Sequence, residues 1–122
     1  MTKDEYKRLL AASSTNKNKY GALRSGGYAS GKEHRRADEL KMMQRAGLIS
    51  DLREQVKYEL IPAQYRDGKL IERACAYVAD FVYFDREANS LVVEDTKGFR
   101  TKEYIIKRKL MLHVHGIVIK EI

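Results

Sequence analysis

The sequence has one cysteine, one proline and no long apolar run among its 122 residues. Because Cys75 stands alone, the chain cannot form an internal disulfide, and we expect a reducing, cytoplasmic compartment. No apolar segment approaches the roughly 20 residues of a membrane-spanning helix. The charged opening, Met1-Thr-Lys-Asp-Glu-Tyr-Lys, is not followed by the apolar core of a signal peptide. We therefore expect no membrane association.

Several familiar catalytic and cofactor motifs are also missing. The chain has no glycine-rich phosphate loop and no Ser-His-Asp arrangement. The three histidines do not form a metal-binding set, because His113 and His115 have no acidic or cysteine partner at a useful spacing. These absences argue against a zinc centre and against a small-molecule enzyme that uses a nucleotide cofactor.

The chain is basic, and its charge is unevenly distributed. The net charge is +7. Residues 1–36 hold nine basic and three acidic side chains, and residues 97–122 hold seven and two. Residues 37–96 are acidic, with eight basic and twelve acidic side chains. Basic flanks would attract a polyanion such as DNA, whereas the acidic middle could hold a metal. Solubility alone is the simpler explanation of such a balance.

The length fits one domain, with a different segment at its N-terminus. We assign residues 1–29 to a short helix over Asp4–Ala12 and a basic, flexible arm, and residues 30–122 to the folded domain. The arm, Ser13–Gly31, is rich in Ser, Asn, Gly and Lys. Either it is an unstructured tail, or its basic residues contact the DNA backbone while Tyr20 and Tyr28 contact bases. The basic residues concerned are Lys17, Lys19 and Arg24.

The folded segment predicts an α/β protein with a mixed central sheet flanked by helices. Ser30-Gly-Lys-Glu33 is a capping box that begins a helix, which Gly47 ends. The expected elements that follow are strands at Leu52–Ile61, from Leu70 or Ile71 to Phe84 and at Leu91–Lys97, a helix at Thr101–Leu112 and a strand at Ile117–Ile119. This order is helix, three strands, helix, strand.

The most informative feature is the pattern Asp-x14-Asp-x-Lys, formed by Asp80, Asp95 and Lys97 on two predicted strands. Side chains two apart on a strand share a face, so Asp95 and Lys97 should project together. A neighbouring strand could bring Asp80 beside them. Two carboxylates and an ammonium group at this position can hold a divalent metal and act on a phosphodiester. The alternative for Asp80 is an ordinary aspartate at a strand end that faces water.

Three further residues are weighed as parts of this site. Glu33 lies on the helix stripe of Ala37 and Leu40 and could reach the strand carboxylates, although the capping box alone explains it. Gln55 could support the scissile phosphate or the attacking water, or could be an exposed edge residue. Glu94 faces away from Asp95, and we interpret it as a solvated partner of a basic neighbour.

Basic residues near this pattern are expected to contact phosphate groups without reading sequence. Lys107 lies beside Arg108 and Lys109 on the second predicted helix, where one of the three could face the site and the others form a solvated face. The full set of expected contacts outside the arm is Lys32, Arg100, Lys102 and Lys107.

The order of these residues resembles the PD-(D/E)XK nuclease superfamily, and within it a phage- and prophage-encoded endonuclease family. A Glu on the first helix, an Asp on the second strand and an Asp-x-Lys on the third carry the resemblance. The matching stretches are Asn18-Lys-Tyr-Gly21, Ser30-Gly-Lys-Glu-His-Arg-Arg36, Glu39-Leu-Lys41, Ala46-Gly-Leu-Ile-Ser-Asp-Leu52, Gln55, Tyr77-Val-Ala-Asp-Phe81, Val93-Glu-Asp-Thr-Lys-Gly98 and Thr101 through Tyr104 to Lys107. One departure is Ala79, which stands where the superfamily often has proline.

The resemblance implies a restriction-endonuclease-like αβββαβ core and DNA cleavage that depends on Mg²⁺ or Mn²⁺. It assigns Glu33, Asp80, Asp95 and Lys97 to the active set. In this hypothesis Asp80 and Asp95 bind the metal with help from the Thr96 carbonyl, and Glu33 holds the metal through water or binds a second ion. Lys97 orients or deprotonates the water, or stabilises charge in the transition state. Related junction resolvases imply branched DNA, a homodimer by analogy, and a role in phage replication, recombination or packaging inside a bacterial host. The rival hypothesis is a non-catalytic DNA-binding or recombination accessory protein with a degenerate nuclease fold.

Overall fold

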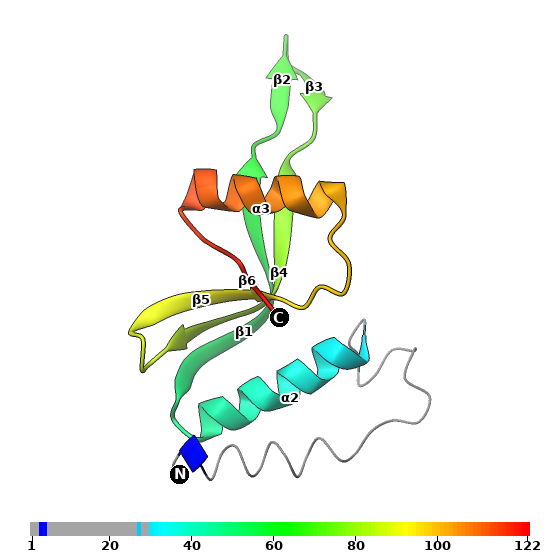
Figure 1. Ribbon diagram of the computed structural model, residues 1–122. Coiled ribbons are helices and arrows are strands. Elements are labelled where there is room, and N and C mark those ends of the chain that lie inside the picture. The colour runs from blue at the N-terminus through cyan, green and yellow to red at the C-terminus, as the bar shows by residue number, and fades with distance from the viewer. Residues whose placement is uncertain (1–2, 5–26, 28–29) are drawn as a thin grey trace. The chain divides into compact units, whose positions relative to one another are not determined.

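The computed structural model describes residues 3–4, 27 and 30–122 (Figure 1). The arm residues Lys17, Lys19 and Arg24 lie outside the described residues, as does nearly all of the predicted helix Asp4–Ala12. The predicted domain boundary between residues 29 and 30 falls at the edge of the described region and stays a prediction. The described elements, in chain order, are α2 (Gly31–Arg45), β1 (Ile49–Ile61), β2 (Gln64–Arg66), β3 (Lys69–Glu72), β4 (Cys75–Asp85), β5 (Ser90–Asp95), α3 (Lys102–His115) and β6 (Lys120–Glu121).

The strands form two sheets, and the predicted α/β class with a mixed sheet is confirmed. The larger sheet has the order β1-β4-β5-β6, so β4 and β5 are its interior strands. The short strand β6 runs parallel to β5, with Asp95 in register with Glu121. Strands β2 and β3 form a separate antiparallel hairpin. The core order of the predicted αβββαβ arrangement is therefore present, with one additional hairpin.

The chain forms two compact units. One unit contains the described residues up to Leu52 together with Tyr83–Leu91. The other contains Arg53–Val82 and Val92–Ile122. We call them the α2 unit and the α3 unit, after the helix that each contains. The predicted residues Asp80, Asp95 and Lys97 all belong to the α3 unit.

The α2 unit is organised by a well-capped helix. The Ser30 side chain accepts a hydrogen bond from the Glu33 backbone N–H at 3.1 Å, as the capping box predicts. Gly47, at φ +79°, follows the helix in the left-handed conformation that glycine tolerates best. The buried residues of α2 are Glu33, Ala37 and Leu40, which confirms the predicted stripe.

The α3 unit contains a hydrophobic core between α3 and the sheet. Tyr104 and Met111 of α3 pack in one cluster with residues of the strands. Figure 1 shows α3 running across β1 and β4, and beyond it the β2–β3 hairpin. The other buried members of the cluster are Leu60, Tyr77, Ala79, Val82, Val93 and Ile119. This core fixes the backbone of β4 and β5, from which the site residues project.

The predicted strand from Leu70 to Phe84 is wrong as a single element. It is divided at Arg73 and Ala74 into β3 and β4, and β3 pairs with the unpredicted strand β2. The turn at Asp67 and Gly68 explains the division. Both residues have positive φ, 51° and 76°, and such a two-residue turn closes a hairpin in which Arg66 pairs with Lys69.

Two other strand boundaries also differ from the prediction. The strand expected at Leu91–Lys97 ends at Asp95, so Thr96 and Lys97 lie in the loop that follows β5. The closing strand is Lys120–Glu121 instead of Ile117–Ile119. Its shift has a local cause, because Ile117 N–H donates to the Met111 carbonyl at 3.3 Å and is thereby bound to the end of α3.

The core of the α3 unit can be tested with two adjacent helix residues. Met111 is 0% exposed and Leu112 is 54% exposed. Met111→Ala should reduce the free energy of unfolding by about 2–5 kcal/mol, because it leaves a cavity in the core. The control Leu112→Ala should change it by less than about 0.5 kcal/mol. Urea denaturation of both variants measures the difference, and equal effects would contradict this packing.

Candidate functional site

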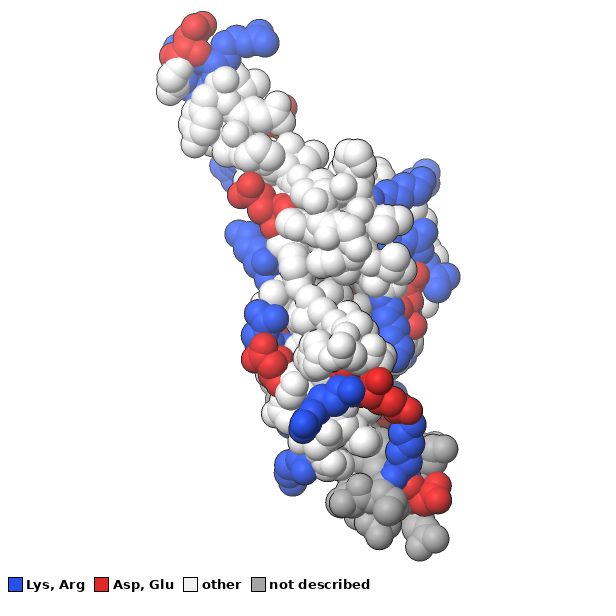
Figure 2. Space-filling view, turned by 90° about the vertical axis from the view of Figure 1, so that its left-hand side faces the viewer, with Lys and Arg blue, Asp and Glu red and all other residues white. Residues whose placement is uncertain are grey.

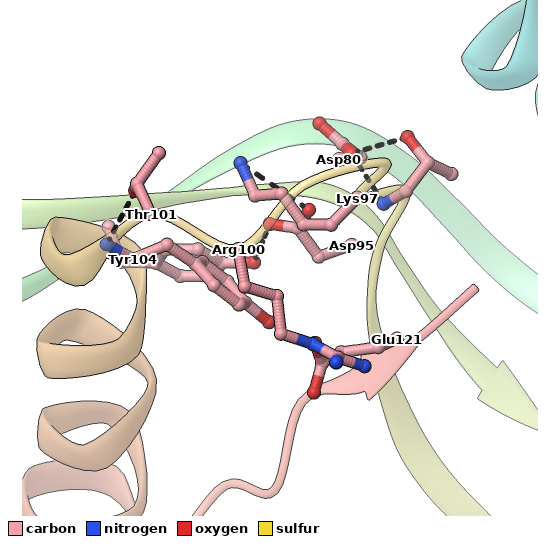
Figure 3. A network of polar contacts seen from close by, with 9 residues as sticks. Asp80, Asp95, Lys97, Arg100, Thr101, Tyr104 and Glu121 are labelled. Atoms are coloured by element: carbon pink, nitrogen blue, oxygen red, sulfur yellow. Dashed lines mark hydrogen bonds and ion pairs between the residues drawn. The ribbon is translucent and has the colours of Figure 1, made fainter.

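Asp80 and the residues that follow β5 are joined by direct hydrogen bonds (Figure 3). Asp80 Oδ2 accepts hydrogen bonds from the backbone N–H and from the hydroxyl of Thr96, both at 2.8 Å. The peptide nitrogen of Thr96 is bonded to the carbonyl carbon of Asp95, so the Asp80 carboxylate lies beside the end of β5. The prediction that a neighbouring strand brings Asp80 close to this segment is therefore met within the α3 unit.

Asp95 is a buried carboxylate whose two oxygens have different surroundings. Its side chain is 2% exposed. Oδ2 accepts a hydrogen bond from the Tyr77 hydroxyl at 2.5 Å. Oδ1 is buried and makes no hydrogen bond within the described part of the chain. The nearest cation to Oδ1 is the Lys97 ammonium, whose Nζ lies 3.7 Å away. Asp95 and Lys97 thus project together, as the spacing predicts.

The surroundings of Asp95 disfavour its charge. Burial raises the pKa of the Asp95 carboxyl, and the nearby charge of Asp80 raises this pKa further. The hydrogen bond from Tyr77 and the charge of Lys97 lower the pKa and only partly offset the burial. Burial also raises the pKa of Tyr77, so this hydroxyl stays protonated and donates a hydrogen bond to Asp95. The molecule therefore maintains an aspartate at a position that costs folding free energy.

Lys97 is held on its other side by an aromatic ring. Its Nζ lies 5.0 Å from the ring centroid of Tyr104, within the range of a cation–π interaction. Tyr104 is buried, and its hydroxyl makes no hydrogen bond within the described residues. Burial, followed by the charge of Glu121, raises the pKa of Tyr104 to about 12. The Lys97 ammonium thus lies between a buried carboxylate and a ring face, while its side chain remains 36% exposed.

The predicted phosphate-contacting residues of the α3 unit have different partners. Arg100 and Arg108 both donate to the carboxylate of Glu121, which joins the loop after β5, helix α3 and strand β6. Lys107 forms an ion pair with Glu103 at 3.1 Å. Lys102 is exposed and forms no ion pair with the described residues. On the face that Figure 2 shows, Lys and Arg side chains are interspersed with Asp and Glu rather than gathered in one patch.

The remaining predicted site residues have different positions. Glu33 is buried in the α2 unit, at 5% exposure, and its part in the site stays a prediction, as does that of the exposed Lys32 in the same helix. Gln55 is exposed on β1 in the α3 unit, with φ at 53°. A left-handed residue within a strand is the mark of a bulge, and bulges are common beside active sites, where they redirect side chains.

The interpretation of Glu94 as a solvated residue is wrong. Its side chain is 0% exposed. Glu94 lies on an interior strand of the larger sheet, in register with Lys120 of β6. In the sequence, Glu94 precedes Asp95 near the end of a short strand, where either exposure or burial would fit the pattern.

The donor set fits a magnesium-type site with few protein ligands. The described residues hold no group of three or more His, Cys, Asp or Glu side chains arranged around a common metal position. Asp95 Oδ1, which accepts no hydrogen bond from the described residues, is nevertheless a hard oxygen ligand, and the Asp80 carboxylate lies beside the adjacent peptide. Mg²⁺ keeps several waters and is usually bound through one or two carboxylates, so two aspartates suffice for it.

Sequence reasoning missed three residues that organise the site: Tyr77, Tyr104 and Glu121. Tyr77 lies three residues before Asp80, and on a regular strand these two side chains would face opposite ways. Tyr104 stands in the sequence within a stretch that carries the family resemblance, without a predicted role in the site. The aromatic character of both residues was the available signal, but it is equally typical of core packing.

Residues 17–118 match the model of a family described as "Protein of unknown function (DUF1064)". The chain belongs to the DUF1064 family. The match includes every site residue discussed above except Glu121, so the candidate site lies within the DUF1064 domain. No curated protein and no solved structure matches the chain. Among its described residues, this DUF1064 protein has no helix long and apolar enough to span a membrane.

The pH dependence of stability tests the burial of Asp95. A raised pKa in the folded state means that folding favours the protonated carboxyl, so wild-type stability falls as the pH rises from the ordinary aspartate value of 3.8 through the raised value. Asp95→Asn cannot ionise and should gain stability over wild type across that window. Urea denaturation in EDTA at a series of pH values measures the difference in the free energy of unfolding between Asp95→Asn and wild type, which we call the gap. A gap that stays constant or shrinks with rising pH would contradict the burial cost. The exposed Asp67→Asn controls for the loss of one negative charge.

Proposed function

We propose that this DUF1064 protein is a metal-dependent DNA endonuclease that hydrolyses phosphodiester bonds. The observation that supports the proposal best is the buried Asp95 carboxylate. One of its oxygens accepts no hydrogen bond from the described residues and lies near the Lys97 ammonium, and Asp80 is hydrogen-bonded to the next residue, Thr96. A buried, incompletely paired charge reduces stability, and such groups cluster at functional sites. The resemblance to PD-(D/E)XK nucleases gives this arrangement its chemical interpretation.

Asp80 and Asp95 would hold Mg²⁺ or Mn²⁺ through the oxygens that the protein leaves without hydrogen bonds. The backbone carbonyl of Thr96 is positioned by the same loop and is the third proposed ligand. When bound, the cation would activate water and neutralise charge on the scissile phosphate. Hard oxygen donors favour Mg²⁺ or Mn²⁺ over Zn²⁺. The roles of Glu33 and Gln55 stay predictions from the sequence.

Lys97 would stabilise negative charge on the phosphate during cleavage. Its ammonium is oriented by Asp95 on one side and by the Tyr104 ring on the other, so little reorganisation is needed when a phosphate approaches. A lysine at its reference pKa near ~10.4 is protonated at neutral pH and cannot serve as a general base. Electrostatic stabilisation is accordingly the role that we assign to Lys97.

The substrate that we propose is branched or junction DNA, bound by a homodimer, by analogy with resolvases of the same superfamily. Exposed cations of the α3 unit would contact the phosphate backbone, and Lys102 is the clearest of them because it has no acidic partner among the described residues. Arg100 and Lys107 would first have to exchange Glu121 and Glu103 for phosphate. Such contacts position DNA and do not read its sequence.

The alternative is a non-catalytic DNA-binding or recombination accessory protein. One observation favours it, namely that the described residues hold no cluster of three metal-ligating side chains. Such a protein would bind DNA through its basic residues, and its buried Asp95 would be a remnant of a degenerate site. Metal-dependent cleavage separates the two proposals.

The cleavage assay uses four-way, flap and duplex DNA with Mg²⁺, Mn²⁺ or EDTA. Wild type should cleave only with metal. Asp80→Asn and Asp95→Asn should each reduce the rate by at least about a hundredfold, comparable to the loss of one charge-stabilising group in other enzymes. DNA affinity, measured by fluorescence anisotropy, should stay near the wild-type value. Asp67→Asn, the same change at the exposed hairpin turn, should cleave normally. DNA binding without cleavage under every condition would favour the accessory protein.

A further inference from the structure

Each of the two site aspartates has one oxygen that accepts a hydrogen bond and one that accepts none from the described residues. Asp95 Oδ2 accepts the Tyr77 hydroxyl, and Asp95 Oδ1 has no hydrogen-bond partner among the described residues. Asp80 Oδ2 accepts both donors of Thr96. The same division therefore occurs in two carboxylates that are held by different residues. It determines how many oxygens each carboxylate can offer to a cation.

We propose that Tyr77 is a positioning residue that restricts Asp95 to a single-oxygen contact with a divalent cation and thereby makes the site selective for Mg²⁺ or Mn²⁺ over Ca²⁺. This inference rests on the proposed function, because it concerns the cation site of the proposed nuclease. Tyr77 itself would touch neither the cation nor the DNA. It acts entirely through Asp95.

The Tyr77 hydroxyl is fixed in place by the core of the α3 unit. The residue is 4% exposed and belongs to the same hydrophobic cluster as Leu60 and Val93. Its ring lies beside that of Tyr104, with the two centroids 6.4 Å apart. A buried ring in a close-packed core cannot turn its hydroxyl away without displacing these neighbours. The donor to Asp95 is thus part of the rigid scaffold.

Asp95 is equally constrained by the cost of losing this hydrogen bond. If the carboxylate rotated to present both oxygens to a cation, the buried Tyr77 hydroxyl would lose its acceptor. A buried polar group left without a hydrogen bond destabilises the folded protein. The carboxylate therefore keeps Oδ2 on Tyr77 and offers only Oδ1, which is already close to Lys97.

One oxygen from each aspartate suits a small cation better than a large one. Mg²⁺ requires near-octahedral coordination and retains several waters, so two single-oxygen contacts satisfy it. Ca²⁺ takes six to eight oxygens and commonly uses both oxygens of a carboxylate. With Asp95 Oδ2 bound to Tyr77 and Asp80 Oδ2 bound to Thr96, a second contact of Ca²⁺ to either carboxylate would have to share an oxygen that already accepts a hydrogen bond, which makes that oxygen a weaker ligand.

Cation binding to the full chain tests this inference without relying on cleavage. The affinity for Mn²⁺ is measured from the electron paramagnetic resonance signal of free Mn²⁺, and the affinity for Ca²⁺ from its competition with Mn²⁺. Tyr77→Phe keeps the ring but removes the hydroxyl. It should weaken Mn²⁺ binding about tenfold, as is usual when a supporting hydrogen bond to a ligand is lost. Ca²⁺ affinity should stay equal or rise, because Oδ2 becomes available.

Tyr58→Phe is the matched control. Tyr58 packs against the same core from β1, and its ring contacts His115 instead of the site. The same loss of a hydroxyl at this position should leave both affinities at the wild-type value. Thermal unfolding of the variants reports whether each one folds.

The outcomes separate this inference from the proposed function. If wild type binds no Mn²⁺, or if Asp95→Asn leaves Mn²⁺ binding unchanged, the proposed site fails and the inference fails with it. If Asp95→Asn abolishes binding but Tyr77→Phe leaves the Mn²⁺-to-Ca²⁺ ratio unchanged, only the role of Tyr77 is overturned. A wild-type protein that binds Ca²⁺ as tightly as Mn²⁺ overturns it as well, even if Tyr77→Phe does not fold.

Discussion

The hydrogen bond from the Tyr77 hydroxyl to Asp95 is the interaction on which the site depends. It joins two buried polar groups on the interior strands β4 and β5. Leaving either group without a hydrogen-bond partner there would destabilise the folded protein. Tyr77 belongs to the hydrophobic cluster formed by α3 and the strands, and Asp95 is 2% exposed. Because one carboxylate oxygen is committed to Tyr77, the other is left as a buried acceptor beside Lys97. The chemistry that we propose begins from that oxygen.

The loop that follows β5 connects the core to the reactive groups. Thr96 binds Asp80 through its backbone and its side chain, and Lys97 lies against Asp95 and the Tyr104 ring. The chain leaves the sheet immediately after Asp95, so three consecutive residues face three different partners. Farther along the loop, Arg100 is bound to Glu121 of β6. The parallel pairing of β5 and β6 therefore supports the loop from a second side.

Much of the fold could be predicted from local patterns. The capped helices and the α/β class follow from capping residues and from the two-residue period of a strand. Asp95 and Lys97 do lie together, although Lys97 reaches Asp95 from the loop and not from the strand that the prediction assumed. The division of β3 from β4 could not be predicted, because a continuous β-type sequence does not reveal where a hairpin separates from the main sheet. The burial of Glu94 could not either, since the alternation along a short strand does not reveal whether both faces of the sheet are covered.

The sequence by itself determined the candidate acids and the lysine, because a carboxylate inside an apolar strand segment and an Asp-x-Lys pair are visible as residue types at a given spacing. Only the tertiary structure decided how each oxygen of these acids is used. Tyr77 and Asp95 are eighteen positions apart, and Thr96 and Asp80 are sixteen, so these contacts exist only after β4 and β5 pair. Hydrogen bonds are short and directional, and a linear pattern carries no information about which buried donor will meet which acceptor.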